Sequence, residues 1–119
     1  MMAQNWRTAV WNARDLLEPF SWFHATVVQV APDLFEPETR GAVRDEVFAT
    51  MALCRNHRFQ LRTAYPEQYR RYVDDIAGSR DEYLAWRVTT AMTLRKLGRQ
   101  DEAAGVGPQW PLINVELLD

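Results

Sequence analysis

The chain has 119 residues, of which 47% are apolar, and its formal net charge is −2. This length allows one domain, and the apolar fraction is too high for a disordered chain. The charge provides no basic field that would attract nucleic acid or an anionic membrane.

The first expected element is a helix from Asn5 to Leu17, because apolar residues recur there at helical spacing. Pro19 either stops this helix or begins the next turn. The apolar segment 20–30 contains a β-branched run at 26–28, which favours a strand. Because the sequence shows no partner strand, we expect a second helix there, and Pro32 ends it.

The middle of the chain predicts two more helices. After a loop at 31–37, an apolar stripe predicts the clearest long helix, at about 38–57. We expect residues 58–65 to form a connection. A proline at the start of segment 66–77 then opens a shorter helix.

The last predicted helix runs from Ser79 to Leu97. Ser79 and Glu82 have the spacing of a capping box, and Gly98 lies in the usual position past the last turn. Glycines and prolines forbid a long helix in the tail, residues 99–119. This apolar tail either wraps its own domain or docks on another chain, and its interface candidates are Trp110, Leu112 and Ile113.

These patterns predict an all-α fold with about five helices in an orthogonal array. We expect a helical domain at residues 1–98 and an extended, irregular tail at 99–119. The tail would dock on a partner or on this domain.

Few residues could hold a metal or carry out catalysis. Cys54 is the only cysteine, so one chain can form neither an intramolecular disulfide nor a cysteine metal cage. His24 and His57 lie on different segments, and a Cys54–His57 pair offers too few ligands for a stable metal site. The sequence contains no phosphate-binding loop and no nucleophile elbow. We therefore predict no catalytic residue and no metal in this chain.

Arginine is concentrated in the middle of the chain. A guanidinium group binds carboxylates and oxyanions through two parallel hydrogen bonds. The tyrosines among these arginines would suit a single-stranded nucleic acid. The neighbouring acidic residues favour a solvated surface or contact with a specific protein, so we predict no nucleic-acid partner. The arginines are Arg55, Arg58, Arg62, Arg70 and Arg71.

Three sequence blocks carry a resemblance to a known family. They are DLFEP at residues 33–37, EVFATMAL at 46–53 followed by RF at 58–59, and DEYLAW at 81–86 followed by LRKLG at 94–98. In order and spacing, these blocks resemble the N-terminal helical domain of the β subunits of nitrile hydratase and thiocyanate hydrolase, and of the β-like activator proteins. The resemblance spans residues 33–98.

The resemblance implies a partner α subunit that holds cobalt or iron in a claw of partly oxidised cysteines. In that family, arginines of the β chain donate hydrogen bonds to the oxidised sulfurs, and aromatic residues shape the nitrile pocket. Carried over to this sequence, the arginine is Arg70 or, as second choice, Arg71, and the aromatic residues are Tyr83 and Trp86. Extra residues at about 60–65 displace the helix that bears the arginine. The SH3-like barrel of a full β subunit has no counterpart here.

The function predicted in this way is that of a non-catalytic β-type subunit, or a maturation partner, of a nitrile hydratase-like metalloenzyme. It would bind the metal-bearing α subunit, together with a further β-type chain, and complete the active-site cleft. The complex would hydrate a nitrile to an amide with metal-activated water. The alternative is a stand-alone helical adaptor or regulator that acts through protein–protein contacts.

The expected location is the cytoplasm, without a membrane partner. Residues 1–11 lack the apolar core of a signal peptide. The sequence also has no apolar run of about 18 residues, the length needed to span a bilayer.

Overall fold

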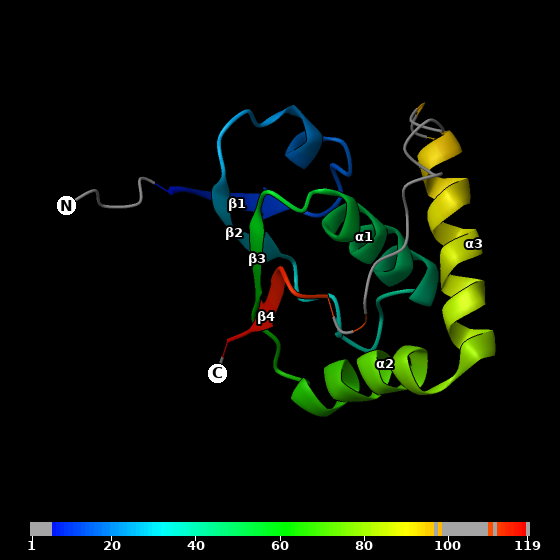
Figure 1. Cartoon of the computed structure of the whole chain (residues 1–119). Helices are drawn as coiled ribbons and strands as arrows, with labels where there is room; N and C mark the ends of the chain where they lie inside the picture. Colours follow the sequence, from blue (N-terminus) through cyan, green and yellow to red (C-terminus); the bar gives the residue numbers. More distant parts are fainter. Residues whose placement is uncertain (1–5, 97, 99–109, 111, 119) are drawn as a thin grey trace.

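The structure, a computed structural model, describes residues 6–96, 98, 110 and 112–118. Within these residues it is an α/β protein with three α-helices and a four-stranded parallel sheet (Figure 1). The expected all-α fold is therefore wrong. In chain order the elements are β1 (Arg7–Asn12), the 3-10 helix η1 (Glu18–Ser21), β2 (Thr26–Ala31), α1 (Gly41–Leu53), β3 (Arg58–Leu61), α2 (Pro66–Gly78), α3 (Arg80–Lys96) and β4 (Val115–Leu117).

The sheet has the strand order β1-β2-β3-β4, and each neighbouring pair is parallel. Every connection therefore moves one strand further in the same direction. Because crossovers between parallel strands share one handedness, connections of this kind place their helices on one face of the sheet. Figure 1 shows α1, α2 and α3 on the same side of the strands. The fold thus has a sheet layer and a helical layer.

The covered face of the sheet is apolar in every strand. The strand register aligns Trp11 with Val30 and Val30 with Leu61, and it places Val28 beside Phe59. These five side chains are all buried and belong to one core cluster. The alternation of strand side chains thus selects one face for burial, as the period of two requires.

The opposite face is polar and stays in contact with solvent. Thr8, Gln29 and Glu116 are exposed there, and Gln60 donates a hydrogen bond from Nε2 to Glu116 Oε1 at 2.9 Å. Two valines also lie on this face: Val10 is 67% exposed, and Val27, aligned with Thr8, is half-buried. No described element covers this face, whereas parallel sheets are usually covered on both sides.

Helix α1 lies between the sheet and α3 (Figure 1). Six consecutive residues, 47–52, are buried, so the C-terminal half of this helix is enclosed by other elements, whereas the charged residues 44–46 before it are only partly buried. On its outer side, the ring of Phe48 stacks on Trp110 at 5.9 Å, and Trp110 meets Trp86 of α3 edge-on at 4.9 Å. An aromatic layer therefore joins α1 to α3.

The C-terminal segment packs on the chain's own core. Leu112 is buried, and residues 115–117 add β4 to the edge of β3. The side chain of Asn114 donates hydrogen bonds to Met51 O, Cys54 O and His57 O, at 2.9, 3.2 and 3.3 Å. One amide thus joins the tail to the end of α1 and the start of β3. Residues 99–109 of the predicted tail lie outside the described residues.

The three helices predicted from residue 38 onward are confirmed. α1 is shorter than the expected 38–57, and α2 follows the expected bounds closely. Ser79 accepts a hydrogen bond from the Glu82 amide on Oγ at 3.3 Å, which caps α3 as the capping box predicted. Gly98 has a φ of +74° and ends this helix in the left-handed conformation that favours glycine.

The helices predicted at 5–17 and 20–30 are wrong, and so is the connection at 58–65. These segments contain β1, η1 with β2, and β3. The helical spacing at 5–17 is coincidental, because Val10 lies on the solvent face while Trp11 is buried. The β-branched run at 26–28 does form a strand. Its partners β1 and β3 are also short, and neither was recognised as a strand from the sequence.

Candidate functional site

Strand β1 is an edge of the sheet in the described part of the chain. The amides of Arg7 and Ala13 donate to Ala25 O and Ala31 O beside β2. In a parallel strand, the N–H and C=O of one residue point to the same side, and the sides alternate. The backbone groups of Thr8 and Val10 and the N–H of Asn12 therefore point outward from the sheet, whereas Asn12 O accepts a hydrogen bond from the Asp15 amide at 2.9 Å. We call this row the β1 edge.

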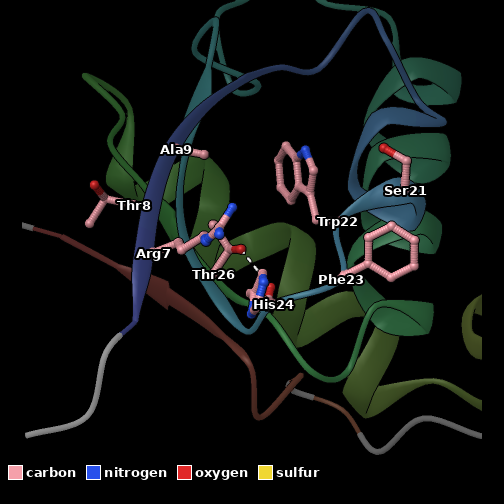
Figure 2. A pocket seen from close by; sticks show the side chains of 8 residues that line it. All are labelled: Arg7, Thr8, Ala9, Ser21, Trp22, Phe23, His24 and Thr26. Atoms are coloured by element: carbon pink, nitrogen blue, oxygen red, sulfur yellow. Dashed lines mark hydrogen bonds between the residues drawn. The ribbon is translucent and has the colours of Figure 1, made fainter.

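A pocket of about 370 Å³ opens beside the β1 edge (Figure 2). In Figure 2, Trp22 stands between β1 and the segment that carries Ser21 and Phe23. None of the lining residues is a carboxylate, whereas Arg7 supplies a positive charge and His24 an imidazole. We call this the edge pocket; it is lined by Arg7, Thr8, Ala9, Ser21, Trp22, Phe23, His24 and Thr26.

Two features make the edge pocket suitable for binding a side chain. Its volume lies at the small end of the range for ligand sites, and Trp22 is an apolar surface within it. Beside it, Phe23 is 98% exposed, an unusual position for a large aromatic side chain. An outward-facing backbone row, an apolar pocket and an exposed ring thus lie along one edge of the protein.

Behind the edge pocket, His57 is buried and fully hydrogen-bonded. Its Nδ1 accepts from the Thr26 amide at 3.2 Å, so Nε2 carries the proton and donates to Pro19 O at 3.1 Å. Burial lowers the pKa of His57, and the bond to Pro19 partly opposes that shift. Because both ring nitrogens are occupied, His57 positions η1 against β2 and is not available as a base or a metal ligand. Cys54, its predicted neighbour in a metal pair, is buried at the end of α1.

The carboxyl ends of the strands, where open α/β sheets usually bind ligands, carry turn-forming side chains. Asp33 accepts from the amides of Phe35 and Ala64, each at 2.9 Å, one on each carboxylate oxygen. Asn12 accepts from the Arg14 amide at 3.0 Å. These groups shape the loops after β1 and β2. Neither Asp33 nor Asn12 belongs to a catalytic arrangement, in which a nucleophile, a base and a group that orients the base lie within hydrogen-bond distance of one another.

No metal site is present among the described residues, since they contain no group of three or more histidine, cysteine, aspartate or glutamate side chains that could hold an ion. The predicted cobalt or iron would in any case lie in a partner chain, so this prediction is not tested. In the described residues, no helix has both the length and the apolar character needed to cross a membrane.

The aromatic residues predicted for a nitrile pocket lie in the helical layer, far along the chain from the β1 edge. Trp86 is buried and packs on Trp110. Tyr83 is half-buried and lines a surface hollow together with Trp110. The structure thus brings together Tyr83, Trp86 and Trp110, which were predicted for the site or the interface. They lie where α3 packs against α1.

The remaining predicted residues are spread over the surface. Arg70 and Arg71 are both exposed on α2. Arg58 lies on the solvent face of β3, with its guanidinium 6.0 Å from the Trp6 ring, whereas Arg62 follows the opposite end of that strand. Of the two remaining interface candidates, Leu112 is buried and Ile113 is 93% exposed.

Near Trp86, Tyr72 donates a hydrogen bond to Asp45 at 2.7 Å. Burial raises the pKa of Tyr72, and the Asp45 carboxylate raises it further, while Arg44 partly opposes the shift. The phenol is therefore held as a donor. It joins α2 to α1 and is not set up to take part in proton transfer.

Sequence reasoning missed the β1 edge and the edge pocket. The only signal was the alternation of Thr8, Val10 and Asn12 with buried positions, and a helical pattern obscured it. The chain was compared with models of known protein families, with curated proteins and with solved structures, and none of the three comparisons gives a match.

Proposed function

We propose that this chain is a non-catalytic protein-binding domain that takes up an extended segment of a partner protein by strand addition at the β1 edge. The observation that carries this proposal is the outward row of backbone groups on β1 beside an apolar pocket. In strand addition, main-chain hydrogen bonds provide affinity, and pockets for alternate side chains provide specificity.

The edge pocket supports one chemistry for the bound segment. Trp22 favours an apolar side chain, and Arg7 favours a carboxylate next to it, because no lining residue is acidic. Phe23 would cover the outer side of the bound segment and lose its contact with water. A short extended sequence that combines one apolar and one acidic side chain fits these features.

An exposed edge strand normally needs protection from unwanted pairing. β1 contains no proline and no lysine, and its single charge is Arg7 at the first position. The strand therefore lacks the usual features that block pairing over Thr8–Asn12. This supports a strand kept available for a specific partner.

A proline on the outward side of β1 tests the proposal. Val10→Pro removes one outward N–H and leaves the bonds to β2, an arrangement that edge strands tolerate. Val10→Thr is the matched control, because it removes apolar surface but keeps the N–H. Full-length wild type and both variants serve as bait in extracts of the source cell, and captured proteins are identified by mass spectrometry.

We expect wild type and Val10→Thr to capture the same partner, and Val10→Pro to lose it at unchanged thermal stability. Hydrogen exchange of the purified complex should then protect the amides of Thr8 and Val10. A partner that binds Val10→Pro as well as wild type, or that leaves both amides unprotected, would overturn strand addition.

The more specific prediction, a β-type subunit or activator of a nitrile hydratase-like enzyme, concerns the identity of the partner. The resemblance behind it is to a helical domain, so the parallel sheet adds no support to it. The same capture tests it: the prediction requires a cysteine-claw α chain with cobalt or iron in the eluate. Any other partner removes it while leaving strand addition intact.

A further inference from the structure

Helix α3 presents an apolar row to solvent on the side opposite its buried residues. Leu84, Val88 and Met92 are 43%, 59% and 64% exposed. They recur every four residues, so they lie on one face of the helix. Figure 1 shows α3 on the outer side of the molecule, with α1 between it and the sheet. Three consecutive turns of a surface helix are therefore apolar on the side where polar residues are normal.

The apolar residues around Val88 are arranged symmetrically before and after it. Leu84 and Met92 lie four positions before and after it, and Ala85 and Ala91 lie three positions before and after it. Asp81 and Arg95 lie seven positions, or about two helical turns, before and after it, so the two ends of this face carry opposite charges. All of these residues are exposed. We call this face the α3 stripe; it comprises Asp81, Leu84, Ala85, Val88, Ala91, Met92 and Arg95.

The geometry points to a second copy of this chain as the occupant of the α3 stripe, in an antiparallel pair related by a two-fold axis at Val88. A two-fold interface requires a patch that is complementary to itself. In this arrangement, Asp81 of each copy meets Arg95 of the other, so both ends of the stripe are paired by opposite charges. A parallel pair would instead oppose Asp81 to Asp81 and Arg95 to Arg95.

The two-fold axis at Val88 also fixes which side chains meet. Residues equally far from Val88 come to the same height, so Leu84 faces Met92 of the second copy, and Ala85 faces Ala91. The larger apolar side chains thus pack against each other, and the two alanines meet each other. Val88 packs against its own copy at the centre.

The α3 stripe is short for a stable dimer interface. From Asp81 to Arg95 the helix spans about 21 Å, which buries less area than the ~1,600 Å² of a standard interface and is typical of a weak, transient one. We therefore expect a dissociation constant in the micromolar range, with monomer below it and dimer above it.

Charge reversal distinguishes this arrangement from non-specific association. Asp81→Arg and Arg95→Asp each replace two attractive contacts with two repulsive ones, so each variant alone should dimerise at least about tenfold more weakly. Mixed with each other, the two variants regain complementary ends and should form a heterodimer at about the wild-type affinity. Glu82→Arg is the matched control, because Glu82 lies in the same first turn of α3 but outside the α3 stripe.

The measurement is sedimentation velocity of the full chain at concentrations around the dissociation constant, with circular dichroism to verify folding. Val88→Asp places two carboxylates at the centre and should give a monomer at every concentration. Wild type that stays monomeric at high micromolar concentration overturns the proposal. So does a single reversal variant that dimerises as wild type does, or a mixture that fails to associate. Val10→Pro leaves the α3 stripe intact, so loss of strand addition and loss of this dimer are separate outcomes.

Discussion

Removing the side chain of Asn114 should cost more stability than its half-buried position in the tail suggests. Its amide donates to three carbonyl oxygens, at 2.9 to 3.3 Å, and one of them, Met51 O, belongs to the last turn of α1. Carbonyls at a helix end have no partner within the helix. In Asn114→Ala, two donated N–H groups are lost, each worth about 1 kcal/mol.

The expected loss in the free energy of unfolding is therefore about 2 kcal/mol, within a range of roughly 1–3. For a domain of this size, that corresponds to a fall in Tm of about 8 °C. The assay is urea unfolding followed by tryptophan fluorescence, with an unchanged slope as the check that only stability has changed. Asn114→Asp should cost more at neutral pH, because a carboxylate would face three carbonyl oxygens.

Gln60→Ala is the matched control for this measurement. It also removes an amide that bonds β3 to β4, but its bond to Glu116 is exposed to water. We expect a loss below about 0.5 kcal/mol, as for most surface substitutions. If Asn114→Ala loses no more than Gln60→Ala, the three bonds do not hold the tail, and the reasoning fails.

Three further predictions concern side chains that are buried or partly buried. Since burial lowers the pKa of His57, the folded protein resists a proton that the unfolded chain accepts. Stability should therefore fall as pH drops below 6.5, and His57→Leu should remove that part of the pH dependence of urea unfolding. Since burial and Asp45 raise the pKa of Tyr72, its phenol should stay protonated when folded protein is titrated past pH 10, so Tyr72→Phe should leave the phenolate absorbance of the folded state unchanged there. Trp11→Ala should cost about 3–5 kcal/mol in the same unfolding assay, because this ring is fully buried, whereas Val10→Ala should cost under about 0.5 kcal/mol.

The helices could be predicted because their signals are local. Ser79 and Glu82 stand three residues apart, Pro66 opens α2 at its first position, and Gly98 lies two residues past the end of α3. Each signal acts within one or two turns, so a short window of sequence contains both the cause and the effect. The apolar stripe of α1 works in the same way.

The sheet could not be predicted in this way, because a parallel strand finds its partner across a long connection. β2 pairs with β3 only after α1 intervenes, and β3 pairs with β4 only after α2 and α3. The strands are also short: β3 and β4 have four and three residues, too few to display a period of two. A β-branched run without a visible partner strand therefore gives no evidence of a sheet in the sequence alone.

The candidate site was missed for a related reason. The β1 edge exists only because β1 is the outermost strand, and strand order is a property of the whole chain. The α3 stripe was different, since the spacing of Leu84, Val88 and Met92 is local. Sequence alone did not show that α3 buries Trp86, Thr90 and Leu94 on its other side and so leaves this face open.

The polar face of the sheet explains why the edge, and not the face, is the surface to examine for binding. Gln29 and Gln60 are aligned in neighbouring strands, and Gln60 is bonded to Glu116. A partner that covered this face would remove water from its polar side chains. The new contacts would have to exceed the free-energy cost of that desolvation. The outward N–H and C=O groups of β1 differ, because an incoming strand replaces each bond to water with a bond of the same kind. A parallel sheet with one wet face can thus remain stable as it is, while its first strand stays open to one more partner.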